Sequence, residues 1–101
     1  MVKPVILTQE ANIERKNILE YWKERNKSDF YSKKLDNIFR ENFRLLSSYP
    51  KIGRLLGIED LRALLVRDYL IIYQDTETLI QIISIWDTRQ DPERLEEKIR
   101  K

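Results

Sequence analysis

The side chains in this sequence that are best suited to chemistry are basic, and they lie in its second half. An arginine fork can hold two phosphate oxygens at once, and a lysine supplies a compact positive charge. These basic side chains between residues 50 and 90 are Lys51, Arg54, Arg62, Arg67 and Arg89. If they converge on one concave face, they favour a site that stabilises charge on a phosphate. Taken singly, Lys51, Arg67 and Arg89 are better explained as solvated charges or as partners of nearby acids. For Arg54 and Arg62 this interpretation and a role in a site are equally supported.

Proton transfer has few candidates in this chain. There is no histidine and no cysteine, which excludes disulfides, thiolate metal sites and a cysteine nucleophile. The carboxylates that could act as a base are Asp87, Glu59 and Glu77, but an aspartate is a poor acid at neutral pH unless its pKa is raised. We therefore expect no metal and no cofactor.

The aromatic side chains have mainly structural interpretations. Tyr69 and Tyr73 alternate on one face of a predicted strand, where we expect sheet and core residues with solvated hydroxyls. Trp22 lies on the apolar stripe of a predicted helix, and it is expected in the core. Trp86 ends a strand beside Asp87; we expect it in the core, with stacking on a base or a partner as the alternative.

Length and composition predict one small domain, residues 1–101. The formal net charge is only +2, so the total charge is a weak argument for nucleic-acid binding. The apolar run near the N-terminus is too short for a signal peptide, and no run approaches the ~20 apolar residues of a spanning helix. We expect a cytoplasmic protein with no membrane partner.

The first half of the chain predicts a strand followed by two helices. Residues 3–8 favour a short strand, and Pro4 places it at the edge of a sheet or marks its start. Apolar residues at helical spacing predict a helix over residues 9–25 with Thr8 as its N-cap. A second amphipathic stripe, which includes Phe30, predicts a helix over residues 29–47 that Ser28 caps. The short connection between the helices indicates an antiparallel helical hairpin.

The second half predicts a loop, three strands and a tail. Residues 50–60 hold both glycines and are interpreted as an ordered loop. Segments rich in Ile, Val and Tyr then predict strands over residues 62–66, 69–74 and 78–86. Their short connections, such as Arg67-Asp68, predict an antiparallel meander. With a short helix or tail over residues 91–101, the order β-α-α-β-β-β is an α+β fold, in which the helical hairpin packs on a mostly antiparallel sheet.

Four segments of the sequence resemble those of one protein family. Residues 49–54 (YPKIGR) resemble the P-x-x-G-R loop of the RelE/ParE superfamily of toxins. Leu61-Arg62 and residues 69–73 (YLIIY) are similar to the strand pair that follows in that family. Residues 82–95 (IISIWDTRQDPERL) resemble its C-terminal ending. The order and spacing agree over about residues 3–95, so the chain is identified as a toxin of a bacterial type II toxin–antitoxin system.

The resemblance implies a partner and two alternative targets. The partner is a cognate antitoxin that neutralises the toxin, with a toxin–antitoxin hetero-oligomer as the expected assembly. ParE-like members bind DNA gyrase and cleave nothing, whereas RelE-like members cut messenger RNA in the ribosome by attack of a 2′-hydroxyl. The shared fold does not decide between them.

The two targets differ in the chemistry that they require. RNA cleavage needs a base, an acid and cations on the phosphate, and the candidates under that hypothesis are Lys51, Arg54, Arg62, Arg89 and Asp87. Asp87 stands where the related ending often has a histidine, and no tyrosine follows Tyr73. Inhibition of gyrase by binding needs no acid–base groups and fits this composition slightly better. A third alternative is an interaction module that shares the fold and has lost toxicity.

Overall fold

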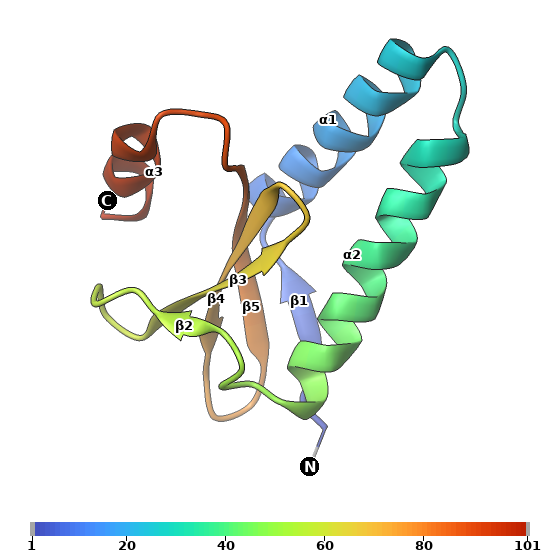
Figure 1. Ribbon diagram of the computed structural model, residues 1–101. Helices are drawn as coiled ribbons and strands as arrows, with labels where there is room; N and C mark the ends of the chain where they lie inside the picture. Colours follow the sequence, from blue (N-terminus) through green and yellow to red (C-terminus); the bar gives the residue numbers. More distant parts are fainter. Residues whose placement is uncertain (1, 101) are drawn as a thin grey trace.

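The computed structural model describes residues 2–100 and shows an α+β fold (Figure 1). Its elements, in chain order, are β1 (Val5–Leu7), α1 (Gln9–Asn26), α2 (Phe30–Ser48), β2 (Arg54–Leu55), β3 (Leu61–Val66), β4 (Tyr69–Asp75), β5 (Ile80–Asp87) and α3 (Pro92–Ile99). The predicted order of one strand, two helices and a strand meander is confirmed. The C-terminal segment forms a short helix with Pro92 in its first turn, where proline is favoured.

The five strands form one sheet in the order β1-β5-β4-β3-β2. The pairs β2–β3, β3–β4 and β4–β5 are antiparallel, whereas β1 is parallel to β5. A parallel pair needs a long crossover, and α1 with α2 supplies it. The N-terminal strand is therefore at an edge, as Pro4 predicts.

The helical hairpin begins and ends at recognisable capping residues. The hydroxyl of Thr8 accepts a hydrogen bond from the backbone N–H of Ala11, which confirms the predicted N-cap of α1. Helix α1 ends before Lys27, which adopts a left-handed conformation with φ 53°. The prediction for the second cap was one residue off: Asp29 is the N-cap of α2, although the Ser28 hydroxyl does accept from the N–H of Phe30.

The hydrophobic core lies between the hairpin and one face of the sheet. Leu35, Phe39 and Leu46 of α2 are fully buried there. They belong to one cluster with buried residues of the facing strands, namely Val66, Tyr69, Ile71, Tyr73, Ile80, Ile82 and Ile85. Phe30, expected on this stripe, is instead 76% exposed, because it is the first residue of α2 and lies at the end of the hairpin. Helix α3 lies on the other side of the sheet and has no buried residue (Figure 1).

Two segments of the second half differ from the prediction. The stretch expected to be only a loop contains the two-residue strand β2, which pairs with Ala63 and Arg62 of β3. Strand β5 begins at Ile80 rather than Thr78, because Thr76 and Leu79 close a turn through hydrogen bonds of both backbone and hydroxyl. The Arg67-Asp68 hairpin turn is present, with Arg67 at a φ of 57°.

The length and polarity of the helices determine whether any of them could span a membrane. Within residues 2–100, no helix combines the length and apolar character that crossing a bilayer requires.

Candidate functional site

A buried tyrosine of the sheet holds the loop that precedes β2. Tyr73 of β4 is fully buried, and its hydroxyl donates to the carbonyl oxygen of Pro50 and accepts from the N–H of Gly53, both at 2.8 Å. Burial raises the pKa of Tyr73 above its ordinary value, so the neutral phenol that makes both bonds persists over the whole physiological range. The expectation of solvated hydroxyls is wrong here, because the loop folds back over this strand.

Arg62 holds the same loop from the side. Its Nη1 atom donates to the carbonyl oxygens of Gly53 at 2.8 Å and of Lys51 at 3.2 Å. One nitrogen of the guanidinium expected to hold a phosphate is thus engaged with the backbone of its own chain. Pro50 and Gly53 of the P-x-x-G-R segment accordingly form one structural unit with Tyr73 and Arg62.

The side chains of Lys51 and Arg54 are not among those that hold this unit together. Both are exposed, and Arg54 lies in β2, where it pairs with Ala63. Among residues 2–100, neither side chain takes part in an ion pair. These two cations are therefore available to a ligand from solvent.

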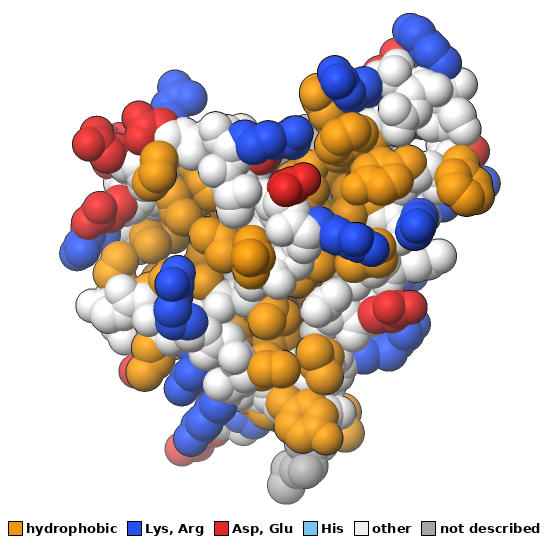
Figure 2. Space-filling view, viewed as in Figure 1, with side chains coloured by type: hydrophobic (Ala, Val, Ile, Leu, Met, Phe, Trp, Pro, Cys, Tyr) orange, Lys and Arg blue, Asp and Glu red, His pale blue; other side chains and the backbone are white. Residues whose placement is uncertain are grey.

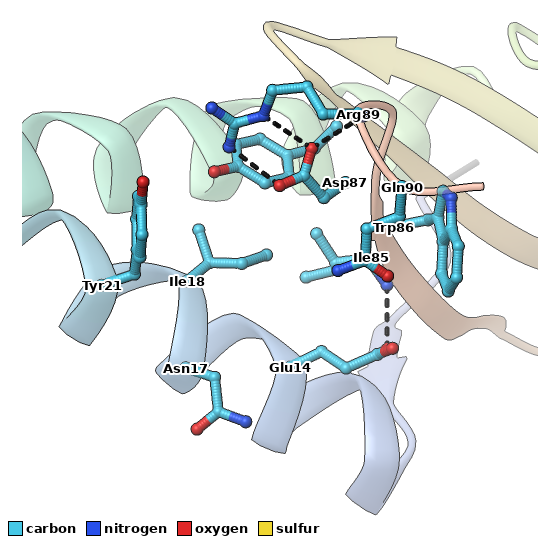
Figure 3. A pocket seen from close by; sticks show the side chains of 10 residues that line it. Glu14, Asn17, Ile18, Tyr21, Ile85, Trp86, Asp87, Arg89 and Gln90 are labelled. Carbon is cyan, nitrogen blue, oxygen red and sulfur yellow. Dashed lines mark hydrogen bonds and ion pairs between the residues drawn. The ribbon is translucent and has the colours of Figure 1, made fainter.

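Asp87 and Arg89 form a separate pair at the end of β5 (Figure 3). Arg89 donates from Nε to Oδ1 at 2.9 Å and from Nη2 to Oδ2 at 2.8 Å, so both carboxylate oxygens are engaged. These hydrogen bonds lower the pKa of Asp87, and they raise that of Arg89. Asp87 is consequently ionised at neutral pH and is a poor proton donor.

A hollow of about 420 Å³ lies beside this ion pair, between α1 and the end of β5. Figure 3 shows Ile18 and Tyr21 of α1 on one side and Ile85 and Trp86 on the other. The polar side chains around it are those of Glu14, Asn17, Tyr69, Asp87, Arg89 and Gln90. It offers an apolar space next to a charge pair that is already neutralised.

The aromatic side chains near this hollow are linked to one another. The indole N–H of Trp22 donates to the hydroxyl of Tyr69 at 2.8 Å, and the Arg89 guanidinium lies 5.7 Å from the Trp22 ring centroid. Tyr69 is buried, and burial raises its pKa, so its hydroxyl is not solvated either. Trp86 is 9% exposed, as a core residue should be.

Glu14 is a structurally important residue that the sequence did not reveal. Its carboxylate accepts from the N–H of Ile85 at 3.1 Å and from the hydroxyl of Ser84 at 3.3 Å, and it also pairs with Lys98 of α3. Lys98 reaches Glu10 as well, at 2.8 Å. Glu14 thereby joins α1, β5 and α3. A helix-surface glutamate carries no local signal of such a role, because its partners are distant in sequence.

The five predicted site residues fall into two groups, so they do not share one concave face. Arg62 pairs with Tyr73 and Asp87 pairs with Tyr69, four residues apart along β4 and on opposite sides of it. With ~3.3 Å per residue and ~4.8 Å between strands, the two backbones are roughly 16 Å apart. Lys51, Arg54 and Arg62 lie at one end of the sheet, and Asp87 with Arg89 at the other.

This arrangement limits the chemistry available at either end. Over the described residues 2–100, the loop group has two cations without an ion-pair partner and no carboxylate bound to it, whereas the β5 group has a carboxylate whose oxygens are both engaged. Within residues 2–100, no three acidic side chains come together in a way that could hold a metal ion. Both places are better suited to binding than to proton transfer.

Comparisons with known proteins agree with the fold. A family model described as the ParE toxin of the type II toxin–antitoxin system parDE matches residues 5–92. A solved structure described as the chromosomal ParDE TA system from P. aeruginosa superposes with a TM-score of 0.74 and 16% sequence identity. That match covers 85% of this chain and 96% of the other, and at this identity it shows a shared fold. No curated protein matches the sequence.

Proposed function

Because the chain belongs to the ParE toxin family of type II toxin–antitoxin systems, we propose that it arrests growth by binding DNA gyrase and cuts no nucleic acid. A cognate antitoxin, the second component of such a system, neutralises it by forming a hetero-oligomer. Gyrase as the target follows the resemblance to ParE-like members. The protein acts, on this proposal, as an inhibitor rather than as an enzyme.

The engagement of the two arginine forks is the observation that carries the non-catalytic proposal. Arg62 donates to two backbone carbonyls, and Arg89 is bound by both oxygens of Asp87. A phosphoryl-transfer site needs such forks free and aimed at the charge that develops in the transition state. Here Arg89 would first have to break its two bonds to Asp87, and Nη1 of Arg62 would have to leave the loop carbonyls.

A ribosome-dependent ribonuclease is the alternative, and one observation favours it. Lys51 and Arg54 are exposed cations near Arg62, as a phosphate-binding surface would require. The alternative still needs a general base and acid, and Asp87 lies at the other end of the sheet. Binding without cleavage therefore accounts for more of the geometry.

The proposal is tested by inducing the chain in cells without antitoxin and following precursor uptake. We expect DNA synthesis to fall first while messages stay whole, and the purified chain to inhibit supercoiling of relaxed plasmid by gyrase. Asp87→Asn should be as toxic as Asp68→Asn, a matched change in an exposed turn. If protein synthesis stopped first, messages were cut and Asp87→Asn alone were harmless, the nuclease alternative would replace this proposal.

A further inference from the structure

We propose that the exposed side chains of residues 49–55, the 49–55 surface, bind the target protein of this toxin. The complementary feature on the target is an apolar side chain next to a carboxylate. This inference rests on the proposed function, because it assumes that the target is a protein. Beyond the proposed function, it assigns the contact with the target to one surface and to one kind of complementary group.

The backbone of the 49–55 surface is fixed before any partner arrives. Tyr73 binds Pro50 and Gly53, Arg62 binds the carbonyls of Lys51 and Gly53, and the N–H of Ile52 donates to Tyr49 at 3.1 Å. A loop held in this way loses little conformational freedom on binding, which favours affinity. These hydrogen bonds come from Tyr73 of β4, from Arg62 of β3 and from within the loop itself.

The outer side of the same segment exposes large apolar side chains. Tyr49 is 63% exposed, Ile52 is 47% exposed and Leu55 is 57% exposed. Figure 2 shows hydrophobic side chains gathered at the lower end of the molecule, near the end of α2 in Figure 1, with basic side chains beside them. Aromatic and apolar side chains on a rigid support are typical of the residues that dominate binding energy.

A hollow of about 500 Å³ adjoins this surface and limits which side chain of a partner can be inserted there. Tyr49, Pro50 and Ile52 contribute apolar lining, and Lys3 with Asp75, an ion pair at 2.6 Å, also lines it. The space is sufficient for one large apolar side chain. Since the carboxylate of Asp75 is already paired, the hollow itself adds no free negative charge.

The charge of the 49–55 surface selects an acidic partner. The segment contains Lys51 and Arg54 and no acidic residue, and neither cation has an ion-pair partner within residues 2–100. Lys51 also lines the hollow, so a carboxylate beside an inserted apolar side chain would meet it. Complementary charge of this kind sets orientation and raises the rate of association.

A protein fits this surface better than a nucleic acid does. A phosphate backbone would use the two cations but would leave the aliphatic side chains of Ile52 and Leu55 without a partner. A protein surface can bury both kinds of group at once, with an apolar centre and a charged rim. Binding of RNA is therefore treated as an outcome that the experiment must exclude.

The experiment compares variants of the surface with matched variants elsewhere. Tyr49→Ser and Ile52→Ser remove the apolar contacts, and Lys51→Glu reverses one charge. Phe30→Ser and Lys34→Glu make equivalent changes at exposed positions of α2. Each purified chain is first checked by circular dichroism and thermal unfolding, and then titrated into a gyrase supercoiling assay.

We expect the three surface variants to raise the inhibitory concentration roughly ten- to thirty-fold, as the loss of a central contact does. The matched variants should stay within about two-fold of the wild type. If the folded surface variants inhibit gyrase as well as the wild type does, the inference is overturned.

Growth arrest in cells distinguishes failure of the inference from failure of the proposed function. If the wild type does not inhibit gyrase, the proposed function fails; loss of toxicity in Tyr49→Ser and Ile52→Ser with messages intact would then still support the surface. If only Lys51→Glu loses toxicity, and loses message cleavage with it, the surface binds nucleic acid and the inference is overturned.

Discussion

Replacing Gly53 by alanine tests whether the loop before β2 is held by close packing against Tyr73. A Cβ atom at position 53 would lie 2.6 Å from the hydroxyl oxygen of Tyr73 and 2.7 Å from its Cε1 atom. Ordinary contacts begin near ~3.4 Å, so the ring or the loop must move by roughly 0.8 Å. The ring is fully buried in β4 and cannot turn into solvent.

The cost of Gly53→Ala follows from that displacement. Overpacking of a well-filled region costs about 1–3 kcal/mol. Movement of the hydroxyl also weakens its bonds to Gly53 and Pro50, each worth about 1 kcal/mol. We therefore expect the free energy of unfolding to fall by roughly 3–4 kcal/mol, and Tm by roughly 15–25 °C for a domain of this size.

Urea unfolding followed by circular dichroism measures this loss, with Gly57→Ala as the matched control. Gly57 has a φ of +77°, and a Cβ atom added there would meet no other atom within 4 Å, so alanine costs only backbone strain of about 1–2 kcal/mol. Adding Tyr73→Phe to Gly53→Ala should cost less than Tyr73→Phe alone, because the hydroxyl bonds are already weakened. A Gly53→Ala protein as stable as Gly57→Ala would refute the reasoning.

Three further predictions concern pH and α3. Asp87→Asn should lower the free energy of unfolding by about 0.5–1 kcal/mol at pH 7, because the pair with Arg89 is partly exposed. The pKa of Asp87 is lowered in the folded protein, so this contribution is present above pH ~4 and is lost as the pH falls further. Urea titrations should therefore show a smaller difference in stability between Asp87→Asn and the wild type at pH 3 than at pH 7. The same difference at both pH values would contradict the assignment. Burial raises the pKa of Tyr73, so the contribution of its phenol to stability is present below pH ~10 and is lost as the pH rises. Between pH 9 and pH 11, Tyr73→Phe should therefore lose less stability than the wild type. Equal losses in the two proteins would count against this role of Tyr73. Lys98→Met should raise the rate of amide hydrogen exchange in α3 much more than in the rest of the chain, because Lys98 pairs with Glu14 and α3 has no buried residue. Unchanged protection of the α3 amides would exclude a role of Lys98 in holding this helix.

The sequence predicted the elements best where periodicity is strong. The three- and four-residue spacing in α2 places Leu35, Phe39 and Leu46 on one stripe, and all three are fully buried. Strands β3, β4 and β5 follow from runs of β-branched and aromatic residues with short turns. Strand β2 was missed because two residues are too few to show alternation, and its pairing depends on β3 rather than on local pattern.

The candidate site was harder to predict because it depends on side-chain direction. The sequence analysis places Arg62 and Asp87 in one candidate ribonuclease site. In the antiparallel meander, however, the start of β3 and the end of β5 lie at opposite ends of the sheet. The partners of Arg62 are backbone carbonyls in a loop that folds back over β4. No pattern of residue types reveals those carbonyls, since every residue carries one.

The shortness of β1 has a consequence for how the protein behaves at high concentration. The parallel pairing with β5 ends at Leu7 and Ile82, so residues 83–87 of β5 would present an open strand edge, the kind that recruits a second chain and leads to aggregation. Instead, the hydroxyl of Thr8 donates to the carbonyl of Ile83, and the carboxylate of Glu14 accepts from the N–H of Ile85. Two polar side chains thus act as a cap on the ladder, and they place the ion pair of Glu14 with Lys98 where a neighbouring strand would have to enter.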